Sequence, residues 1–248
     1  MIQKRYQQSK PSRPMNAWSF NRTVVCLIIL LYTLLGCKGK IENKIVFKCD
    51  FTGTATPSRV GPEYTPYPLE DWQVSNGKLE CLVSRENRTV HLLTPQLREG
   101  TFEMEVEVGF YNGDLVGNSK NWAGFNLGAD NLSSDHAVDR KGLNIGVSTN
   151  GVLFIGTPSP NPKNKNVMKA LPTGVNLKVQ LRPETNNYVV NVAISDISTG
   201  KLLANISKNH VAIERWKGDL ALVSNFQSNA KDQSSFTKSV WFKDWKIY

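Results

Sequence analysis

Strict alternation of apolar and acidic residues between Thr101 and Gly109 constrains the fold more than any other feature of the chain. The apolar positions are Phe102, Met104, Val106 and Val108, and the carboxylates are Glu103, Glu105 and Glu107. A period of two is typical of a half-buried β-strand, because successive side chains point to opposite faces. We therefore expect a strand whose apolar face covers a core and whose acidic face meets water.

The rest of the chain repeats this strand signal between short turns, such as Asn76-Gly77 and Thr149-Asn150-Gly151. Only residues 211–217 have a helical pattern, ended by Gly218. The proline-bearing stretches 52–68 and 157–169 are expected to be long loops, the second with a basic, Asn-rich tail. About a dozen short strands without a long helix predict an all-β antiparallel sandwich or a closed barrel.

The first 36 residues have the pattern of a secretory signal, with basic residues followed by a short apolar stretch from Thr23 to Gly36. That stretch is shorter than the roughly 20 residues of a spanning helix. Translation from Met1 or from Met15 leaves the same mature chain. Leu34-Leu35-Gly36-Cys37 resembles a bacterial lipobox, which implies cleavage before Cys37 and a lipid on its sulfur. A lipid anchor in the cell envelope, periplasmic or at the outer membrane, is therefore predicted, with plain secretion and a spanning helix as alternatives.

The net charge of +9 is mostly a property of this leader. The leader holds five basic and no acidic residues, so the predicted mature chain keeps 25 basic against 21 acidic residues. It has no run of five or more basic residues, which argues against nucleic-acid binding and leaves weak attraction to an acidic surface. Residues 37–44 would form a short tether and 45–248 one domain.

Two cysteines, Cys49 and Cys81, remain after Cys26 is removed with the leader and Cys37 takes the lipid. An oxidising compartment permits a disulfide between them, and two separate buried thiols are the alternative. Sequence does not give the Cα separation on which the choice depends.

Several ordered sequence words run through the domain: Asp71-Trp72-x-Val74-x-Asn76-Gly77-x-Leu79-Glu80-Cys81, Thr89-Val90-His91-Leu92-Leu93-Thr94, Trp122-Ala123-Gly124-Phe125-x-x-Gly128-Ala129, Gly218-x-Leu220-Ala221-Leu222-Val223-Ser224-Asn225 and Trp241-Phe242-x-Asp244-Trp245. Together they resemble the concanavalin A-like, laminin-G-type sandwich that precedes the metallophosphatase domain of some bacterial alkaline phosphatase D-like proteins. The resemblance implies a jelly-roll β-sandwich over residues 47–248. It does not carry the phosphatase activity over, because His91, His136 and His210 form no ligand-like pair.

Loop residues that combine aromatic rings with amides and carboxylates are the candidate ligand-binding set: Tyr64, Tyr67, Tyr111, Asp114, Asn118 and Asn121. Flat rings beside fixed hydrogen-bonding groups suit sugars. The preferred function is a lipid-anchored, non-catalytic binding module for a carbohydrate or another extended polar ligand. One alternative is a truncated or split accessory domain that packs on a metallophosphatase encoded nearby.

A second alternative, a glycoside hydrolase, depends on Glu103, Glu105 and Glu107, whose spacing is similar to the acidic triad of family 16 enzymes. A solvated strand face explains the same residues. Related sandwiches hold a structural Ca²⁺ between their first and last strands. That resemblance implies Asp50 and Asp244 as ligands, with a backbone carbonyl near Gly77.

Overall fold

The structure is a computed structural model, and it describes residues 46–52, 60–111, 119–129, 142–160, 162–227 and 237–248. The chain divides into two units, Met1–Asn43 and Lys44–Tyr248, and every described residue belongs to the second. The signal, the tether and Cys37 lie outside the described residues. In the described ranges, no helix has the length and apolar character needed to cross a bilayer.

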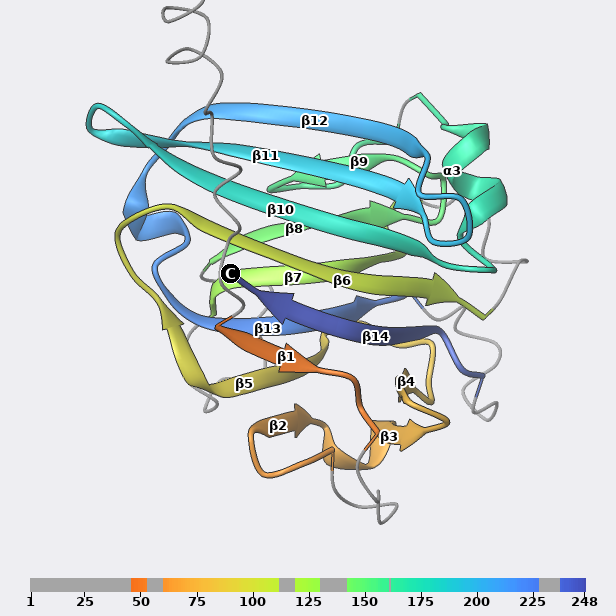
Figure 1. Ribbon diagram of the computed structural model, residues 1–248. Coiled ribbons are helices and arrows are strands. Elements are labelled where there is room, and N and C mark those ends of the chain that lie inside the picture. The colour runs from red at the N-terminus through yellow and green to blue at the C-terminus, as the bar shows by residue number, and fades with distance from the viewer. Residues whose placement is uncertain (1–45, 53–59, 112–118, 130–141, 161, 228–236) are drawn as a thin grey trace, which may run out of the picture. The chain divides into compact units, whose positions relative to one another are not determined.

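Two antiparallel sheets stack face to face in the described part of the chain, with β12, β11, β10, β6 and β14 in the layer nearer the viewer (Figure 1). That eight-stranded sheet has the order β12 (Leu202–Val211), β11 (Asn187–Asp196), β10 (Val175–Glu184), β6 (Phe102–Phe110), β14 (Val240–Ile247), β4 (Lys78–Cys81) and β3 (Trp72–Ser75), with β1 (Phe47–Cys49) also paired to β14. The six-stranded sheet has the order β2 (Tyr64–Tyr67), β5 (Arg88–Leu97), β13 (Gly218–Asn225), β7 (Trp122–Ala129), β8 (Leu143–Ser148) and β9 (Leu153–Ile155). The predicted all-β sandwich is confirmed.

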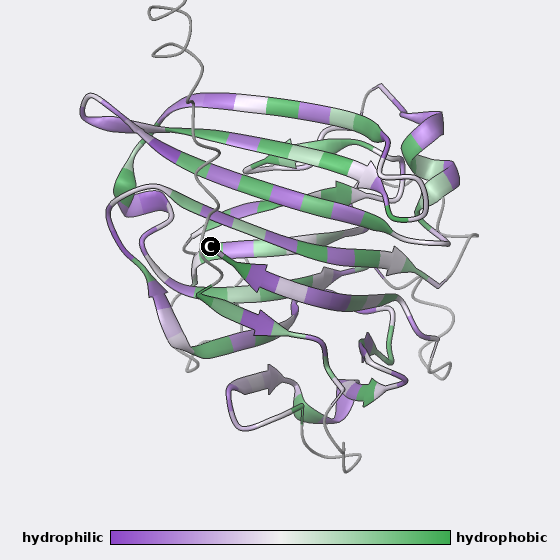
Figure 2. Cartoon of the chain, viewed as in Figure 1, coloured by the Kyte–Doolittle hydropathy of each residue, from purple (hydrophilic) through white to green (hydrophobic). Residues whose placement is uncertain are grey.

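Alternating burial along the strands produces the core between the two sheets. Met104, Val106 and Val108 of β6 are fully buried, as the alternation between Thr101 and Gly109 predicts. Figure 2 shows the same alternation as hydrophobic and hydrophilic bands along β6, β10 and β11. Removing such side chains from water supplies most of the stability of a sandwich, at about 1.5–3 kcal/mol per large apolar residue.

Trp245 on the last strand ties both layers together. Its ring lies 5.7 Å from Phe47, 6.2 Å from Tyr64 and 6.3 Å from Phe125, measured between ring centroids. These partners come from β1, β2 and β7, so one side chain joins elements of both sheets. Aromatic contacts of this kind stabilise beyond simple area burial.

The turn chemistry is confirmed at the β3–β4 hairpin, where Asn76 and Gly77 both have positive φ angles of 52° and 68°. That pair of conformations is the tight turn that an Asn-Gly sequence favours. The predicted helical turn at 211–217 is present as a short 3₁₀ helix, η3 (Ile213–Arg215), and a second one, η1 (Leu69–Asp71), precedes β3.

Two elements differ from the sequence prediction. The stretch 52–68 was expected to be a loop, yet β2 (Tyr64–Tyr67) lies in it and pairs with β5 at the edge of the six-stranded sheet, a position that tolerates Pro66. The stretch 157–169 was expected to be a loop, yet α3 (Lys165–Ala170) begins inside it. The reason is local: the side chain of Asn164 accepts hydrogen bonds from the backbone N–H groups of Asn166 and Val167, which caps the helix. Val167 and Ala170 then bury the apolar side of α3.

Candidate functional site

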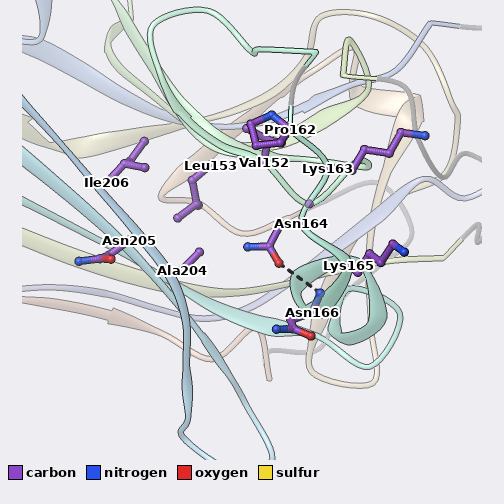
Figure 3. Close-up of a pocket in the computed structure, with 11 residues that line it drawn as sticks. Val152, Leu153, Pro162, Lys163, Asn164, Lys165, Asn166, Ala204, Asn205 and Ile206 are labelled. Carbon is purple, nitrogen blue, oxygen red and sulfur yellow. Dashed lines mark hydrogen bonds between the residues drawn. The ribbon is translucent and has the colours of Figure 1, made fainter.

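A hollow of about 500 Å³ opens where the edges of the two sheets approach each other, between β12 of one sheet and β9 of the other (Figure 3). Apolar side chains form its floor: Val152, Leu153, Ala204 and Ile206. The segment from Pro162 into the first turn of α3 forms its far wall. Leu153 belongs to the main core at 7% exposure, and Ala204 and Ile206 pack partly against that core, so the two edge strands leave only part of this apolar lining exposed.

Asn164 is the polar group best placed in this hollow. Its Oδ1 accepts from the N–H groups of Asn166 at 3.1 Å and Val167 at 3.2 Å. Those two bonds fix the side-chain rotamer, and Figure 3 shows the amide nitrogen directed toward the side of Leu153 and Ala204. The cap of α3 thus aims a donor at the hollow.

A second hollow of about 370 Å³ lies over β10, β11 and β12. Its lining is mainly polar, and its outward-facing members are Lys178, Gln180, Asn191, Asn205 and Ser207. The two hollows share Asn205 and Ile206, but they lie on opposite faces of the edge strand β12, because Ile206 faces inward and Asn205 outward. We call the two together, with all their lining residues, the β12 groove.

The β12 groove has the chemistry of a site for a polar ring compound. Asn and Gln amides offer both donors and acceptors, and the Ser207 hydroxyl offers one of each. Leu153 and Ile206 offer an apolar surface beside them. Ligand sites commonly combine an apolar lining with a few convergent polar groups. Sequence reasoning missed Asn164 and Asn205 as site residues, although the Asn-rich tail of 157–169 is a signal that could have pointed to Asn164.

Two residues of the predicted ligand set belong to the interior instead. Tyr64 is only 8% exposed and packs on Phe51 and Trp245. Asn121 is 2% exposed, and its Oδ1 accepts from the backbone N–H of Gln227 at 2.8 Å. Both assignments are corrected: these side chains hold the fold together, because burial takes them away from any ligand.

The two exposed tyrosines of the set are Tyr67 and Tyr111, at 39% and 40% exposure. Tyr67 lies on β2 of the six-stranded sheet, whereas Tyr111 follows β6 of the eight-stranded sheet, so the structure does not bring them together. Asp114 and Asn118 lie outside the described residues.

The hydroxyl of Tyr111 donates to the buried carboxylate of Glu80. Lys238 and Gln73 donate to the other carboxylate oxygen at 2.8 and 2.6 Å. Burial raises the pKa of Glu80, but the bonds from Lys238, Tyr111 and Gln73 outweigh it and leave the pKa below its ordinary value. The polar end of Tyr111 is therefore committed to an internal network.

The acidic face of β6 forms ion pairs with its neighbours. Lys178 pairs with Glu103, and Lys246 lies 3.1 Å from Glu105. Burial raises the pKa of Glu105, but bonds from Tyr248, Lys246 and Asn176 outweigh it and lower the pKa overall. A glycosidase needs one carboxyl whose pKa is raised, so that it can donate a proton. Glu105 is tuned in the opposite direction, toward a structural carboxylate.

A second, smaller cluster covers the face of the six-stranded sheet that points away from the main core. It consists of Trp122, Phe154 and Val223. Next to it, Thr89 Oγ1 lies 3.2 Å from His91 Nε2, and both residues are buried. Burial lowers the pKa of His91, opposed by the nearby charge of Asp219. His91 is thus a neutral structural residue near pH 7.

Cys49 and Cys81 are free thiols, which corrects the disulfide alternative. Cys49 is paired with Trp245 near the end of β14. On β4, Leu79 is paired with Phe242, so Cys81, two residues further along β4, lies opposite the start of β14. About five residues of strand separate the two positions, or about 16 Å at 3.3 Å per residue. A disulfide needs Cα atoms within about 7 Å.

The two carboxylates expected to hold a cation lie next to the end of the β1–β14 ladder. The last pair of that ladder is Cys49 with Trp245, Asp50 follows β1, and Asp244 precedes Trp245 on β14. The backbone oxygen of Asp50 lies 3.7 Å from where a Cβ of Gly77 would sit. Asp244 has a φ of +49° at a register shift in β14. Across the described ranges, no three His, Cys, Asp or Glu side chains cluster as metal ligands, so backbone carbonyls would have to supply the remaining oxygens.

No protein-family model matches the chain, and comparison with curated proteins finds no match. Solved structures are similar in fold. Arcelin-5, a lectin-like defense protein from Phaseolus vulgaris, aligns at TM-score 0.52 and 8% identity over 81% of this chain and 96% of that one. Basic winged bean lectin with Tn-antigen aligns at 0.52 and 12% identity, over 82% and 98%. The VIP36 lumenal domain in its Ca²⁺/Man2-bound form aligns at 0.51 and 10% identity, over 81% and 86%. The fold is therefore a concanavalin A-like, lectin-type β-sandwich.

Proposed function

We propose that the chain is a non-catalytic carbohydrate-binding module and that the β12 groove is its ligand site. The observation that carries the proposal is an apolar lining beside the Asn164 amide in the first hollow, with further amides in the second hollow, on a lectin-type sandwich. The apolar side of one sugar ring would lie on Leu153 and Ile206, with Asn164 bonding to its hydroxyl groups, while Asn205 would bond to a second ring on the outer face of β12. VIP36 and winged bean lectin are described with bound mannose disaccharide and Tn-antigen, which makes carbohydrate the first ligand class to test.

A glycan array probed with the purified full chain tests this function. Wild-type chain should bind a subset of glycans, and Asn205→Ala should weaken that binding because one set of groove bonds is lost. Asn209→Ala is the matched control, since Asn209 is exposed on the same strand but lines neither hollow. Absence of binding to every glycan, or equal loss in both variants, would contradict the proposal. Turnover of a bound glycan would contradict its non-catalytic part.

We further propose that Cys37 carries the lipid and holds the module in the cell envelope. The lipobox-like sequence supports this, because two or three acyl chains give stable anchoring where one does not. Wild-type chain should enter the detergent phase of a phase-separation assay, and Cys37→Ala should not. A Cys37→Ala chain that still partitions with detergent would refute the anchor.

The relation to alkaline phosphatase D-like proteins remains a proposal supported by the ordered sequence words. Each word falls on a strand or hairpin of the sandwich: β3–β4, β5, β7, β13 and β14. An accessory role would require a metallophosphatase partner. Co-purification of such a protein with the tagged chain would support this role, and its absence among captured proteins would oppose it.

A structural Ca²⁺ at the Asp50–Asp244 position is the cofactor we propose. Asp50 and Asp244 flank the last pair of the β1–β14 ladder, and the Asp50 carbonyl lies near Gly77, which supports the proposal because Ca²⁺ takes oxygen ligands of these kinds. The ion would join the first and last strands of the sandwich and so act on stability rather than on chemistry.

A further inference from the structure

Lysine side chains border the β12 groove on several sides. Lys163 and Lys165 line the first hollow before and within α3, and Figure 3 shows both side chains extending away from Leu153, Ala204 and Ile206. Lys208 on β12 lies near Gly156, which follows β9, with its Nζ 3.7 Å from where a Cβ of Gly156 would sit. Two lysines therefore line the first hollow, and a third lies just outside its lining.

Among the residues that the structure describes, no carboxylate lines either hollow. The fourth lysine, Lys178 of the second hollow, is neutralised by its ion pair with Glu103. No ion pair of Lys163, Lys165 or Lys208 is seen among the described residues. The groove therefore carries a local positive charge, even though the predicted mature chain is only +4 overall.

We infer that the ligand of the β12 groove is an extended anionic glycan, whose carboxylate or sulfate groups meet Lys163, Lys165 and Lys208 while its rings cover the apolar floor. This inference rests on the proposed carbohydrate-binding function. The extended form follows because the two hollows lie on opposite faces of the edge strand β12, so a ligand that fills both must wrap around this edge at Asn205 and Ile206. Uronates and sulfated sugars share the required chemistry, a negative charge on a ring compound.

Matched pairs of glycans separate the charge from the backbone. Oligogalacturonate and its methyl ester form one pair, and a sulfated galactan and its desulfated form make the other. Titration of the full chain should show binding to the charged member of at least one pair and binding at least about ten-fold weaker to its neutral partner. The pair that responds identifies carboxylate or sulfate as the ligand group. High salt should weaken the binding, because exposed charges are screened.

Variants test whether these lysines are responsible. Each exposed ion pair contributes a factor of about two to five in affinity. The triple variant Lys163→Gln, Lys165→Gln, Lys208→Gln should therefore bind the charged glycan at least about eight-fold more weakly. Lys169→Gln is the control, because Lys169 is an exposed lysine in the last turn of α3 and, unlike Lys163 and Lys165, lines neither hollow.

The outcomes separate the inference from the function on which it rests. Equal affinity for the charged and neutral members, or equal loss in the triple variant and Lys169→Gln, overturns the anionic preference and leaves glycan binding in place. Binding to neutral glycans alone also overturns the anionic preference and leaves glycan binding in place. Binding to no glycan at all overturns both.

Discussion

Asn164 does two jobs that a single substitution can separate. Its Oδ1 caps α3 through bonds of 3.1 and 3.2 Å, whereas its amide nitrogen faces the β12 groove. Asn164→Asp keeps the cap acceptor and the shape but removes the donor and adds a negative charge. Asn164→Ala removes both the cap and the donor.

The structure sets the expected magnitudes. Loss of an N-cap costs about 1 kcal/mol, and Asp caps as well as Asn does. In a domain of this size, 1 kcal/mol lowers Tm by about 2–4 °C. Asn164→Ala should therefore melt about 2–4 °C below wild type, and Asn164→Asp within about 1 °C of it. Loss of one hydrogen bond to a ligand, at about 0.5–1.5 kcal/mol, weakens glycan binding about two- to ten-fold in Asn164→Ala. Asn164→Asp weakens it by at least as much, because its added negative charge also repels an anionic glycan.

Differential scanning fluorimetry and glycan titration on the same samples give both readouts. The reasoning predicts a stable Asn164→Asp variant with weakened binding. If Asn164→Asp melted as low as Asn164→Ala, the cap assignment would be refuted. If it bound glycan as tightly as wild type, Asn164 would have no part in the site.

Three further predictions concern stability. Burial lowers the pKa of His91 below its ordinary 6.5, so the contribution of neutral His91 to the free energy of unfolding is present above that pH and is lost as the pH falls. Tm should therefore drop from pH 7 to pH 5. A His91→Gln variant whose Tm shows the same full drop would refute this. Ca²⁺ should raise Tm relative to a chelator in wild type but not in Asp244→Ala, and a Tm indifferent to Ca²⁺ in wild type would remove the proposed ion. Gly109→Ala should cost about 1–3 kcal/mol in urea denaturation, because the new Cβ would overlap the Trp241 ring; an unchanged midpoint would contradict that packing.

The sheets could be predicted from the sequence because their signal is local. Alternation between Thr101 and Gly109 reports which face of β6 is buried, and Asn76-Gly77 reports a tight turn, so each needs only neighbouring residues. Helix α3 was missed because its six residues carry too little periodicity to stand out. Its capping residue, Asn164, was the only strong local signal, in a stretch dominated by prolines.

The site was largely missed because it depends on pairing between distant strands. Asn164 and Asn205 are brought to one groove only by the approach of β9, α3 and β12. The prediction of Tyr64 as a ligand-binding residue was wrong for a different reason. Tyr64 lies in a proline-rich stretch that is typical of a loop, but tertiary packing buries its ring against Trp245. The pairing of Asp50 with Asp244 as cation ligands came from a fold resemblance rather than from spacing and stays a prediction; the β1–β14 ladder ends at Cys49 and Trp245, the residues next to them.

Chemical-shift mapping of the full chain with a glycan selected from the array tests the central claim most directly. The account predicts that titration shifts the amide signals of Leu153, Asn164 and Asn205, while those of Tyr67 and Tyr111 stay in place. Shifts confined to Tyr67 or Tyr111, with the β12 groove unaffected, would contradict it.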